Sequence, residues 1–232
     1  MYQVVHCRGR ASRLPKALSR IDILTLVASQ QRDAERTRAE LLAVATEVFA
    51  EDGYSGARVD IIAERTRTTK RMIYYYFGSK EGLYLAVLEN AYRGIREAER
   101  AIDVAHTDPR AAIRELAELT FDHHVTHDDF IRLVSIENIH RGEFIRRIDS
   151  LRTLGQPAMT ILEGILDRGR SAGVFRTDVD ALDVHLVISA YCVFQVANRH
   201  TFGYLFDVDF DARRAHLRAL IGDVVVSWLS AL

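Results

Sequence analysis

The sequence predicts an all-α protein, on three observations. Proline is scarce, with three residues in 232, and glycine is modest at thirteen, so the frequent turns of an all-β fold are missing. No stretch shows the alternating apolar and polar residues of a half-buried strand, whereas apolar residues recur at helical spacing in several segments. Hydrophobic residues make up 48% of the chain, enough to bury the cores of one small and one medium-sized domain.

Composition narrows the classes of function. The 31 basic and 32 acidic side chains give a net charge of −1, which excludes a chain-wide basic surface but allows a small basic face for nucleic acid. The two cysteines, Cys7 and Cys192, lie far apart and predict no disulfide framework. No apolar run reaches the ~20 residues of a membrane span, and no cleavage site follows the late apolar stretch at 21–28. We therefore expect a cytoplasmic protein without membrane association.

Residues 1–31 form a basic extension. It contains five basic side chains, from Arg8 to Arg20, and one acidic side chain, Asp22. Five positive charges less one negative charge give the segment a net charge of +4. The first interpretation is a disordered extension, or a start site that has been assigned too early. The alternative is an arm that follows DNA phosphates or enters a minor groove, as basic arms do in other DNA-binding proteins.

A helix is predicted over residues 32–52. Its apolar residues recur from Leu41 at i, i+1, i+4, i+7 and i+8, which places them on one stripe of an amphipathic helix. Gly53 can end this helix, because glycine readily adopts the left-handed backbone of a helix C-cap. A shorter helix over 59–65 follows, with Ile62 on its inward face.

Three residues mark the ends of the next two helices. Thr69 can cap the first by accepting a hydrogen bond from a free backbone N–H group, and Gly78 ends it. Ser79 can cap the second, which is expected over 81–105. Lys80 then lies in the first turn, where the helix dipole disfavours a cation unless an anion is bound there. We interpret Lys80 as a phosphate clamp.

The short helix between Thr69 and Gly78 has two contrasting faces. At about 100° per residue, Ile73 and Phe77 lie close together and point inward. Arg71 and Tyr75 point the opposite way. An isolated globular core gains little from such a face, whereas Arg can fork onto guanine or phosphate and Tyr hydroxyls can reach phosphate oxygens. The pattern therefore predicts a helix that reads a DNA duplex.

These residues resemble the DNA-binding domain of the TetR family of transcriptional repressors. The matching segments are 49–54, 62–63 and 72–83, and the most specific part is an aromatic triplet followed by Phe and then Ser-Lys-Glu. The turn reads Thr66-Arg67-Thr68 where the family usually has Ala-Gly-Val. Ala57-Arg58 stands where the family often has Thr-Ser or Thr-Thr.

The resemblance implies a helix-turn-helix DNA-binding domain over residues 32–95, with residues 65–77 docked in the major groove. Four side chains are expected at base edges and four on phosphates. The expected base contacts are Thr68, Thr69, Arg71 and Tyr75, and the expected phosphate contacts are Arg58, Lys70, Tyr74 and Lys80.

Residues 96–232 are predicted to form a helical regulatory and dimerisation domain. Asp108-Pro109 is a helix start, with Asp as the cap and Pro at the first position. With the helices before it, the chain is expected to contain roughly nine or ten. The further helices are expected over 110–126, 128–140, 142–154, 157–172, 180–202 and 210–229.

The last two helices carry more apolar residues than one buried stripe needs, so each is either fully buried or pairs with another subunit. The resemblance implies that they form a four-helix dimer interface. Two-fold symmetry also places two reading helices about 34 Å, or one DNA turn, apart. We therefore expect a homodimeric, ligand-responsive repressor on a palindromic double-stranded operator.

Polar residues on apolar helix faces suggest a pocket for an unidentified small-molecule effector. Such groups need hydrogen-bond partners, which either a ligand or the surrounding core can supply. The expected ligand-binding residues are Phe121, His124, Ile136, His140, Tyr191, Phe194, Gln195 and Asn198.

Two alternatives remain open. His123, His127 and Glu137 are spaced for a metal-dependent helical enzyme or metal sensor, although the second Glu-x-x-His motif of a di-iron bundle is missing. No nucleophile elbow, phosphate-binding loop or dinucleotide fingerprint occurs, so we expect no enzyme, no metal and no cofactor. The other alternative is a helical adaptor whose apolar C-terminal helices bind a different protein.

Overall fold

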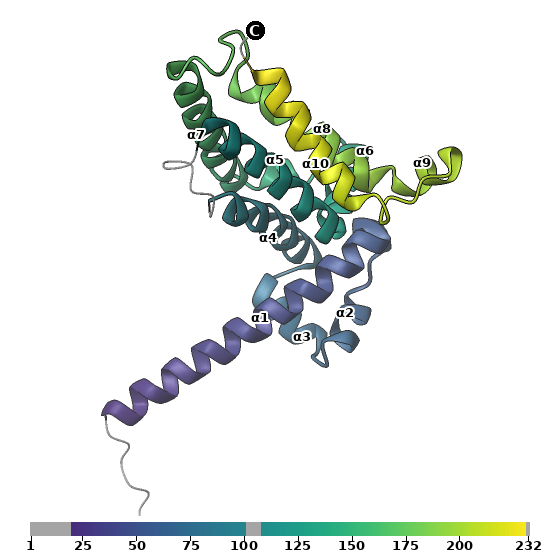
Figure 1. Cartoon of the computed structure of the whole chain (residues 1–232). Helices are drawn as coiled ribbons and strands as arrows, with labels where there is room; N and C mark the ends of the chain where they lie inside the picture. The colour runs from purple at the N-terminus through teal and green to yellow at the C-terminus, as the bar shows by residue number, and fades with distance from the viewer. Residues whose placement is uncertain (1–19, 101–107, 231–232) are drawn as a thin grey trace, which may run out of the picture. The chain divides into compact units, whose positions relative to one another are not determined.

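The computed structural model describes residues 20–100 and 108–230, and Figure 1 shows them as helices joined by short loops. In these ranges the only strand-like pairing is one isolated antiparallel bridge between Phe175 and Ser230. The predicted all-α fold is confirmed. The helices are α1 (Arg20–Gly56), α2 (Val59–Arg65), α3 (Lys70–Phe77), α4 (Lys80–Arg100), α5 (Pro109–Thr126), α6 (Asp128–Ile139), the 3₁₀ helix η1 (Ile145–Arg147), α7 (Ser150–Ser171), α8 (Ala181–Ala197), α9 (Arg199–Phe206) and α10 (Arg214–Leu229).

The predicted N-terminal extension is described in part. Residues 20–31 begin α1, whereas residues 1–19, and Cys7 with them, lie outside the described residues. The chain up to Ala39 forms a unit of its own. Within that unit the Thr37 hydroxyl donates to the carbonyl of Asp33 at 2.8 Å, and Arg36 pairs with Asp33 at 3.5 Å. A DNA-following role for this segment stays a prediction.

From Glu40 onward, α1, α2, α3 and the start of α4 enclose one apolar core. Phe49, Ile62, Ile73 and Leu83 each come from a different one of these helices, and all four are fully buried. Burying a side chain of this size stabilises the fold by about 1.5–3 kcal/mol. This core holds α3 by one face and so determines which face stays outside.

Gly53 interrupts α1 where the sequence predicted a stop. Its backbone has φ 67° and ψ 176°, which no helical residue adopts, and one further turn runs to Gly56. The break carries Tyr54 onto the core, where its ring centroid lies 5.3 Å from that of Tyr84 and 4.3 Å from that of Phe144.

Helix α5 is the central element of the remaining bundle and packs against α7, α8 and α10. Its start is as predicted, because the Asp108 carboxylate accepts hydrogen bonds from the backbone N–H groups of Arg110 and Ala111 at 3.0 and 3.1 Å. Phe121 lies in the core that these helices share.

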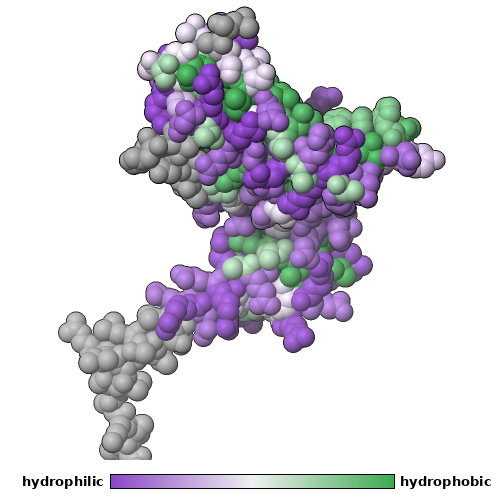
Figure 2. Space-filling model, in the orientation of Figure 1, coloured by the Kyte–Doolittle hydropathy of each residue, from purple (hydrophilic) through white to green (hydrophobic). Residues whose placement is uncertain are grey.

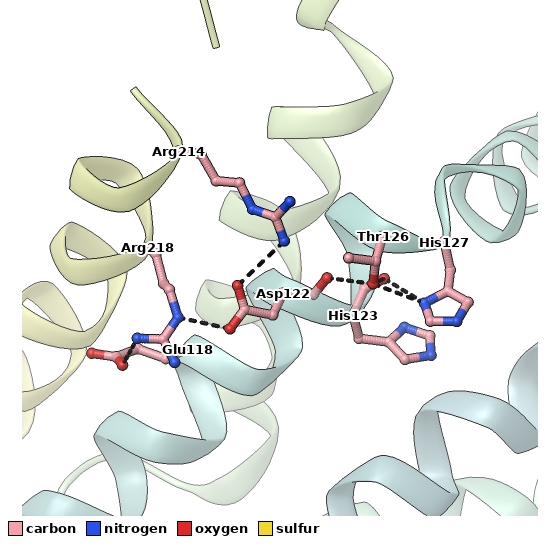
Figure 3. A network of polar contacts seen from close by, with 7 residues as sticks. All are labelled: Glu118, Asp122, His123, Thr126, His127, Arg214 and Arg218. Carbon is pink, nitrogen blue, oxygen red and sulfur yellow. Dashed lines mark hydrogen bonds and ion pairs between the residues drawn. The ribbon is translucent and has the colours of Figure 1, made fainter. Parts of the chain in front are cut away.

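Ion pairs fix α10 along α5, as Figure 3 shows. Arg218 of α10 pairs with Glu118 and, at 2.7 Å, with Asp122 of α5. Arg214 adds a longer contact of 3.7 Å to Asp122. Because these pairs join successive turns of both helices, a shift of α10 by one turn would break all of them.

The predicted helix over 142–154 and the predicted boundary at Pro157 are wrong. Gly142 has φ 68°, and only the short η1 forms before α7 begins at Ser150. Helix α7 then runs through Pro157. A proline removes one backbone hydrogen bond from a helix interior. Its would-be acceptor is the carbonyl of Thr153, an exposed residue, so water can replace the lost donor.

The predicted single helix over 180–202 is also wrong. Helix α8 ends at Ala197, and α9 leaves it at 73°. The bend is at Asn198, whose φ of −107° and ψ of 3° fall outside the helical region. Its carbonyl still accepts from the backbone N–H of Phe202 at 2.9 Å, which starts the new helix.

Candidate nucleic-acid interface

Helix α3 presents the outward face that the sequence predicted. Ile73 is fully buried, whereas Arg71 is exposed and the side chain of Tyr75 is 78% exposed. Tyr74 and Met72 flank this face and are also exposed. Arg71 forms no ion pair with any residue that the structure describes, so its guanidinium is available to an external anion.

The ends of α3 and α4 are capped as predicted. The Thr69 hydroxyl accepts from the backbone N–H of Met72 at 3.3 Å, and Gly78 adopts φ 75°. The Ser79 hydroxyl accepts from the N–H of Gly82 at 3.0 Å. An added Cβ on Gly82 would lie 2.0 Å from the carbonyl oxygen of Phe77, so only glycine allows α3 and α4 to approach this closely.

Lys80 starts α4, next to the Ser79 cap. Its ammonium lies 4.9 Å from the ring centroid of Tyr54 and is half-buried. A cation over an aromatic face is held by the ring quadrupole. This contact holds the amine at the ring of Tyr54, and the phosphate-clamp role of Lys80 stays a prediction.

Two predicted phosphate contacts have partners within the protein. Lys70 pairs with Asp60 of α2, and Arg58 approaches the same carboxylate at 3.5 Å. Thr68 is half-buried in the turn before α3. A phosphate would have to compete with Asp60 for both cations, so we expect Lys70 and Arg58 to contribute less than Lys80.

Arg67 was not among the predicted DNA contacts. It lies in the turn with φ 51°, the left-handed region where the family usually has glycine. The N–H of Thr68 bonds the carbonyl of Ala63 at 2.9 Å, and the N–H of Arg67 bonds that of Glu64 at 3.1 Å, so both groups are satisfied at the end of α2. A side chain in this conformation costs about 1–2 kcal/mol. The sequence already pointed to Arg67, because a basic residue occupies a turn position at which glycine is preferred.

A buried carboxylate of α6 joins α4 to the bundle. Glu137 of α6 accepts from the Tyr84 hydroxyl at 3.0 Å and from the backbone N–H groups of Phe144 and Ile145 at 3.2 and 3.0 Å. Burial and the nearby carboxylate raise the pKa of Tyr84 well above its ordinary value, so Tyr84 stays a hydrogen-bond donor. Both carboxylate oxygens of Glu137 therefore have donors within the protein.

A second link runs beside the first. Arg147 of η1 pairs with Glu81 of α4 at 2.8 Å and with Glu143 at 3.2 Å. Glu81 directly follows Lys80 along the chain. Through this pair, η1 is connected to the first turn of α4, where the phosphate clamp is predicted.

A cavity of about 400 Å³ lies between α4, η1, the start of α7 and α8. Its apolar lining comes chiefly from η1 and α7, and its polar lining is cationic. The lining residues are Tyr92, Arg96, Ile145, Arg146, Ile148, Leu151, Arg152, Leu154, Gly155 and His185. This volume lies within the ~300–1,000 Å³ of small-molecule sites.

Two family comparisons cover most of the described chain. Residues 41–87 match the family described as bacterial regulatory proteins, tetR family, and residues 109–225 match the tetracyclin repressor-like C-terminal domain. The chain belongs to the TetR family. It is a DNA-binding transcriptional regulator, and its fold joins an N-terminal helix-turn-helix domain to a C-terminal helical domain.

Individual TetR-family relatives agree with this assignment. The chain is 37% identical over 191 residues to the HTH-type transcriptional repressor NicS of Pseudomonas putida, a match that spans 82% of this chain and 89% of NicS. The crystal structure of SCO4942 from Streptomyces coelicolor matches with a TM-score of 0.57 at 26% identity over 81% of this chain and 97% of its own. The fold of FadR from Bacillus subtilis, solved with stearoyl-CoA, matches with a TM-score of 0.63 at 20% identity over 82% and 98%.

The eight predicted ligand-binding residues do not line the 400 Å³ cavity. The Tyr191 hydroxyl donates to the carbonyl of Leu217 at 3.0 Å and so joins α8 to α10. Asn198 forms the α8–α9 bend, and Phe194 lies edge-on to Phe202 with ring centroids 5.4 Å apart. The remaining predicted residues are buried or lie at the end of α6: Phe121 and His124 are buried, Ile136 is half-buried, and His140 is exposed at the C-cap of α6.

Gln195 was predicted to need a polar partner, and its Oε1 atom is buried without a hydrogen bond. It lines a gap of about 10 Å³ beside Phe121. A gap of this size holds about one water molecule. We therefore expect a water rather than an effector beside Gln195.

The metal alternative is not favoured. In residues 20–100 and 108–230 no group of three or more histidine, cysteine, aspartate or glutamate side chains is placed to hold a metal ion. The rings of His123 and His127 stack with centroids 4.3 Å apart, and Nδ1 of His127 lies 3.0 Å from the carbonyl of His123 (Figure 3). Glu137 is occupied at the α4 junction. Stacking and hydrogen bonding account for His127 and Glu137, whereas Nδ1 of His123 is buried without a hydrogen-bond partner among the described residues.

No single described helix combines the length and the apolar composition that crossing a membrane requires. Helices α8 and α9 meet that criterion only when they are taken together, and the pair is bent by 73°.

Burial gives two histidines of α5 an unusual titration. The protein lowers the pKa of His123 and that of His124 from 6.5 to about 4, chiefly because burial disfavours the charged imidazolium. The unfolded chain therefore takes up protons first as the pH falls. The stability that these neutral histidines contribute is complete above pH 6.5 and is lost as the pH falls toward 4.

We expect the free energy of unfolding of the TetR-family protein to fall as the pH is lowered from 6.5 toward 4, and a His124→Asn variant to show a shallower fall. Urea unfolding across this pH range measures both slopes. His216→Asn, which changes an exposed histidine of α10, is the control and should keep the wild-type slope. An equal slope in wild type and His124→Asn would contradict the assignment.

Proposed function

We propose that the protein is a homodimeric repressor that binds a palindromic operator through α3 and releases it when a small molecule occupies the C-terminal bundle. The single observation that carries this proposal is the outward placement of Arg71 and Tyr75 over the buried Ile73. NicS is named a transcriptional repressor, which supports the sign of control.

In the proposed complex, some exposed side chains of α3 and its neighbours contact bases and others contact phosphates. Arg71 and Tyr75 point away from the core, and we assign them to base edges together with Thr68 and Thr69. Lys80 and Tyr74 are assigned to phosphates, with Arg58 and Lys70 in a weaker role because they share Asp60. Arg67 joins the phosphate group, since its cation stands at the turn that precedes α3.

The proposed dimer uses α8 and α10. Leu182 and Leu186 of α8 are 55% and 58% exposed, and Val224 of α10 is 43% exposed. Figure 2 shows a further hydrophobic area over α9, where Tyr204, Leu205 and Phe206 are exposed. Apolar side chains that stay in water on neighbouring helices favour burial against a second copy.

The proposed operator binding has a direct test. Purified protein should protect a palindromic site in the DNA just upstream of its own coding region, in a footprinting experiment. Protection of two half-sites one helical turn apart supports both the reader and the dimer. The absence of any protected site, with a folded protein, would contradict the proposal.

Arg71→Ala should weaken operator binding by about 1–3 kcal/mol and relax the sequence preference at one position of each half-site, because a forked contact to a base edge is lost. Competition binding against operators with single base changes measures both effects. Arg110→Ala removes an exposed arginine from the start of α5 and should change neither. If Arg71→Ala weakens all sequences alike, Arg71 holds phosphate and reads no base.

Lys80→Ala should weaken binding to operator and unrelated DNA by the same factor, because a phosphate contact carries no sequence information. The slope of log affinity against log salt should become shallower by about one unit. Titrations over a range of salt concentrations measure this slope. An unchanged slope would remove Lys80 from the phosphate contacts.

Arg67→Gly should stabilise the fold by up to about 1 kcal/mol while weakening DNA binding and lowering the salt slope, since it relieves a left-handed residue and removes a cation. Thermal unfolding and salt titration measure the two effects. Arg141→Gly is the matched control: Arg141 has φ 59° at the end of α6, so its replacement relieves the same strain. This control should stabilise the protein without changing DNA binding, and full DNA affinity in the Arg67→Gly variant would exclude Arg67 from the interface.

A further inference from the structure

The 400 Å³ cavity carries unbalanced positive charge. Its lining includes Arg96, Arg146 and Arg152 and no carboxylate. Arg96 is nearly buried, with 11% of its side chain exposed, and pairs with Glu99 at 2.6 Å. Arg146 and Arg152 are exposed at the cavity and make no ion pair with any described residue. Burial lowers the pKa of His185, so its imidazole adds no charge near neutral pH.

The rest of the lining is apolar. Ile145 and Ile148 come from η1 and the residue after it, Leu151 and Leu154 from the first turns of α7, and Tyr92 from α4. A guanidinium presents a planar fork that binds carboxylate or phosphate through two hydrogen bonds. Two such forks beside an apolar wall suit a molecule with one anionic end and one apolar end.

We propose that the effector is an organic anion with an apolar body, bound with its anionic group on Arg146 and Arg152 and its body against the η1 and α7 leucines and isoleucines. This inference rests on the proposed ligand-responsive function and specifies the chemistry of its effector. Arg96 remains the internal partner of Glu99, whose pKa is raised chiefly by burial.

The cavity is also placed to act on the DNA-binding side. η1 contributes Ile145 and Arg146 to the cavity, and its next residue, Arg147, pairs with Glu81 beside Lys80. The residue before η1, Phe144, packs its ring at 5.1 Å from that of Tyr84. An occupant that moves Arg146 therefore displaces the segment that contacts the first turn of α4. The effector changes operator affinity only to the extent that it binds one position of η1 better than the other.

The test compares two probes that differ by one charged group: 1-anilinonaphthalene-8-sulfonate and the neutral N-phenyl-1-naphthylamine. Fluorescence titration of the full-length protein should show that Arg146→Gln with Arg152→Gln lowers the affinity for the sulfonate at least about tenfold and leaves that for the neutral probe within about twofold. Arg110→Gln is the matched control and should change neither. Loss of both probes alike, or of neither, overturns the proposal.

A second variant locates the binding within the cavity. Gly155 lines the cavity and an added Cβ there meets nothing within 4 Å, so we expect Gly155→Phe to place its ring in the cavity. It should abolish binding of both probes and keep operator binding. Retained probe affinity would place the dye elsewhere, for example on the exposed apolar surface of α9, and would overturn the proposal.

Displacement of the sulfonate then identifies the anionic group. Decanoate and decyl phosphate should each displace it from wild type. The stronger competitor shows whether the site prefers a carboxylate or a phosphate group. Decanol is the neutral control and should displace it at least about tenfold less well. Equal displacement by decanol would overturn the requirement for an anion.

Operator binding by wild type and by Arg147→Gln, measured with and without the sulfonate, distinguishes failure of the effector assignment from failure of the proposed function. Bound sulfonate should lower the operator affinity of wild type, and Arg147→Gln should keep the probe affinity while reducing that shift. An undiminished shift in Arg147→Gln overturns the η1 route. If wild type protects its operator but shows no charge-dependent probe binding, only the effector assignment fails, whereas a protein that protects no operator refutes the proposed function itself.

Discussion

The buried carboxylate of Glu137 is the interaction on which the rest of the structure depends. Moving a carboxylate out of water costs several kcal/mol unless donors compensate it. Here the Tyr84 hydroxyl and the backbone N–H groups of Phe144 and Ile145 do so at 3.0–3.2 Å. These donors come from α4 and from the segment that leads into η1. One side chain thus fixes the DNA-binding domain, through α4, against the part of the bundle that lines the cavity.

Charge placement reconciles a net charge of −1 with the two anion-binding sites proposed above. Many of its cations are matched: Arg65 pairs with Glu47, Lys70 with Asp60, and Arg218 with Glu118 and Asp122. Arg71 on the reading face and Arg146 at the cavity have no such partner among the described residues. Each proposed site therefore contains an arginine without an ion-pair partner among the described residues, beside other cations that are paired, Lys70 with Asp60 and Arg96 with Glu99.

Local signals made much of the DNA-binding domain predictable. Thr69, Gly78 and Ser79 cap or end helices through contacts with residues a few positions away, so the local sequence is enough to predict them. The cavity was not predictable in this way, because Tyr92, Arg146, Leu154 and His185 come from four segments whose packing no local pattern encodes. The boundary predicted at Pro157 was wrong for a related reason, because the cost of a helical proline depends on whether the freed carbonyl reaches water. The bend at Asn198 likewise reflects tertiary packing, not a breaker residue.

Two of the contacts at the junction between η1 and α4 are individually weak. Arg147 and Glu81 are 45% and 43% exposed, and such surface pairs contribute only about 0.2–1 kcal/mol. The ring contact between Phe144 and Tyr84 adds about 0.5–1.5 kcal/mol beyond its buried area. Coupling between two sites of a regulator is typically about 1–3 kcal/mol, so neither contact accounts for it alone. Under the proposed mechanism an effector gains that leverage by moving η1 as a unit, and the hydrogen bonds of Glu137 to Tyr84, Phe144 and Ile145 then change together with the contact to Glu81.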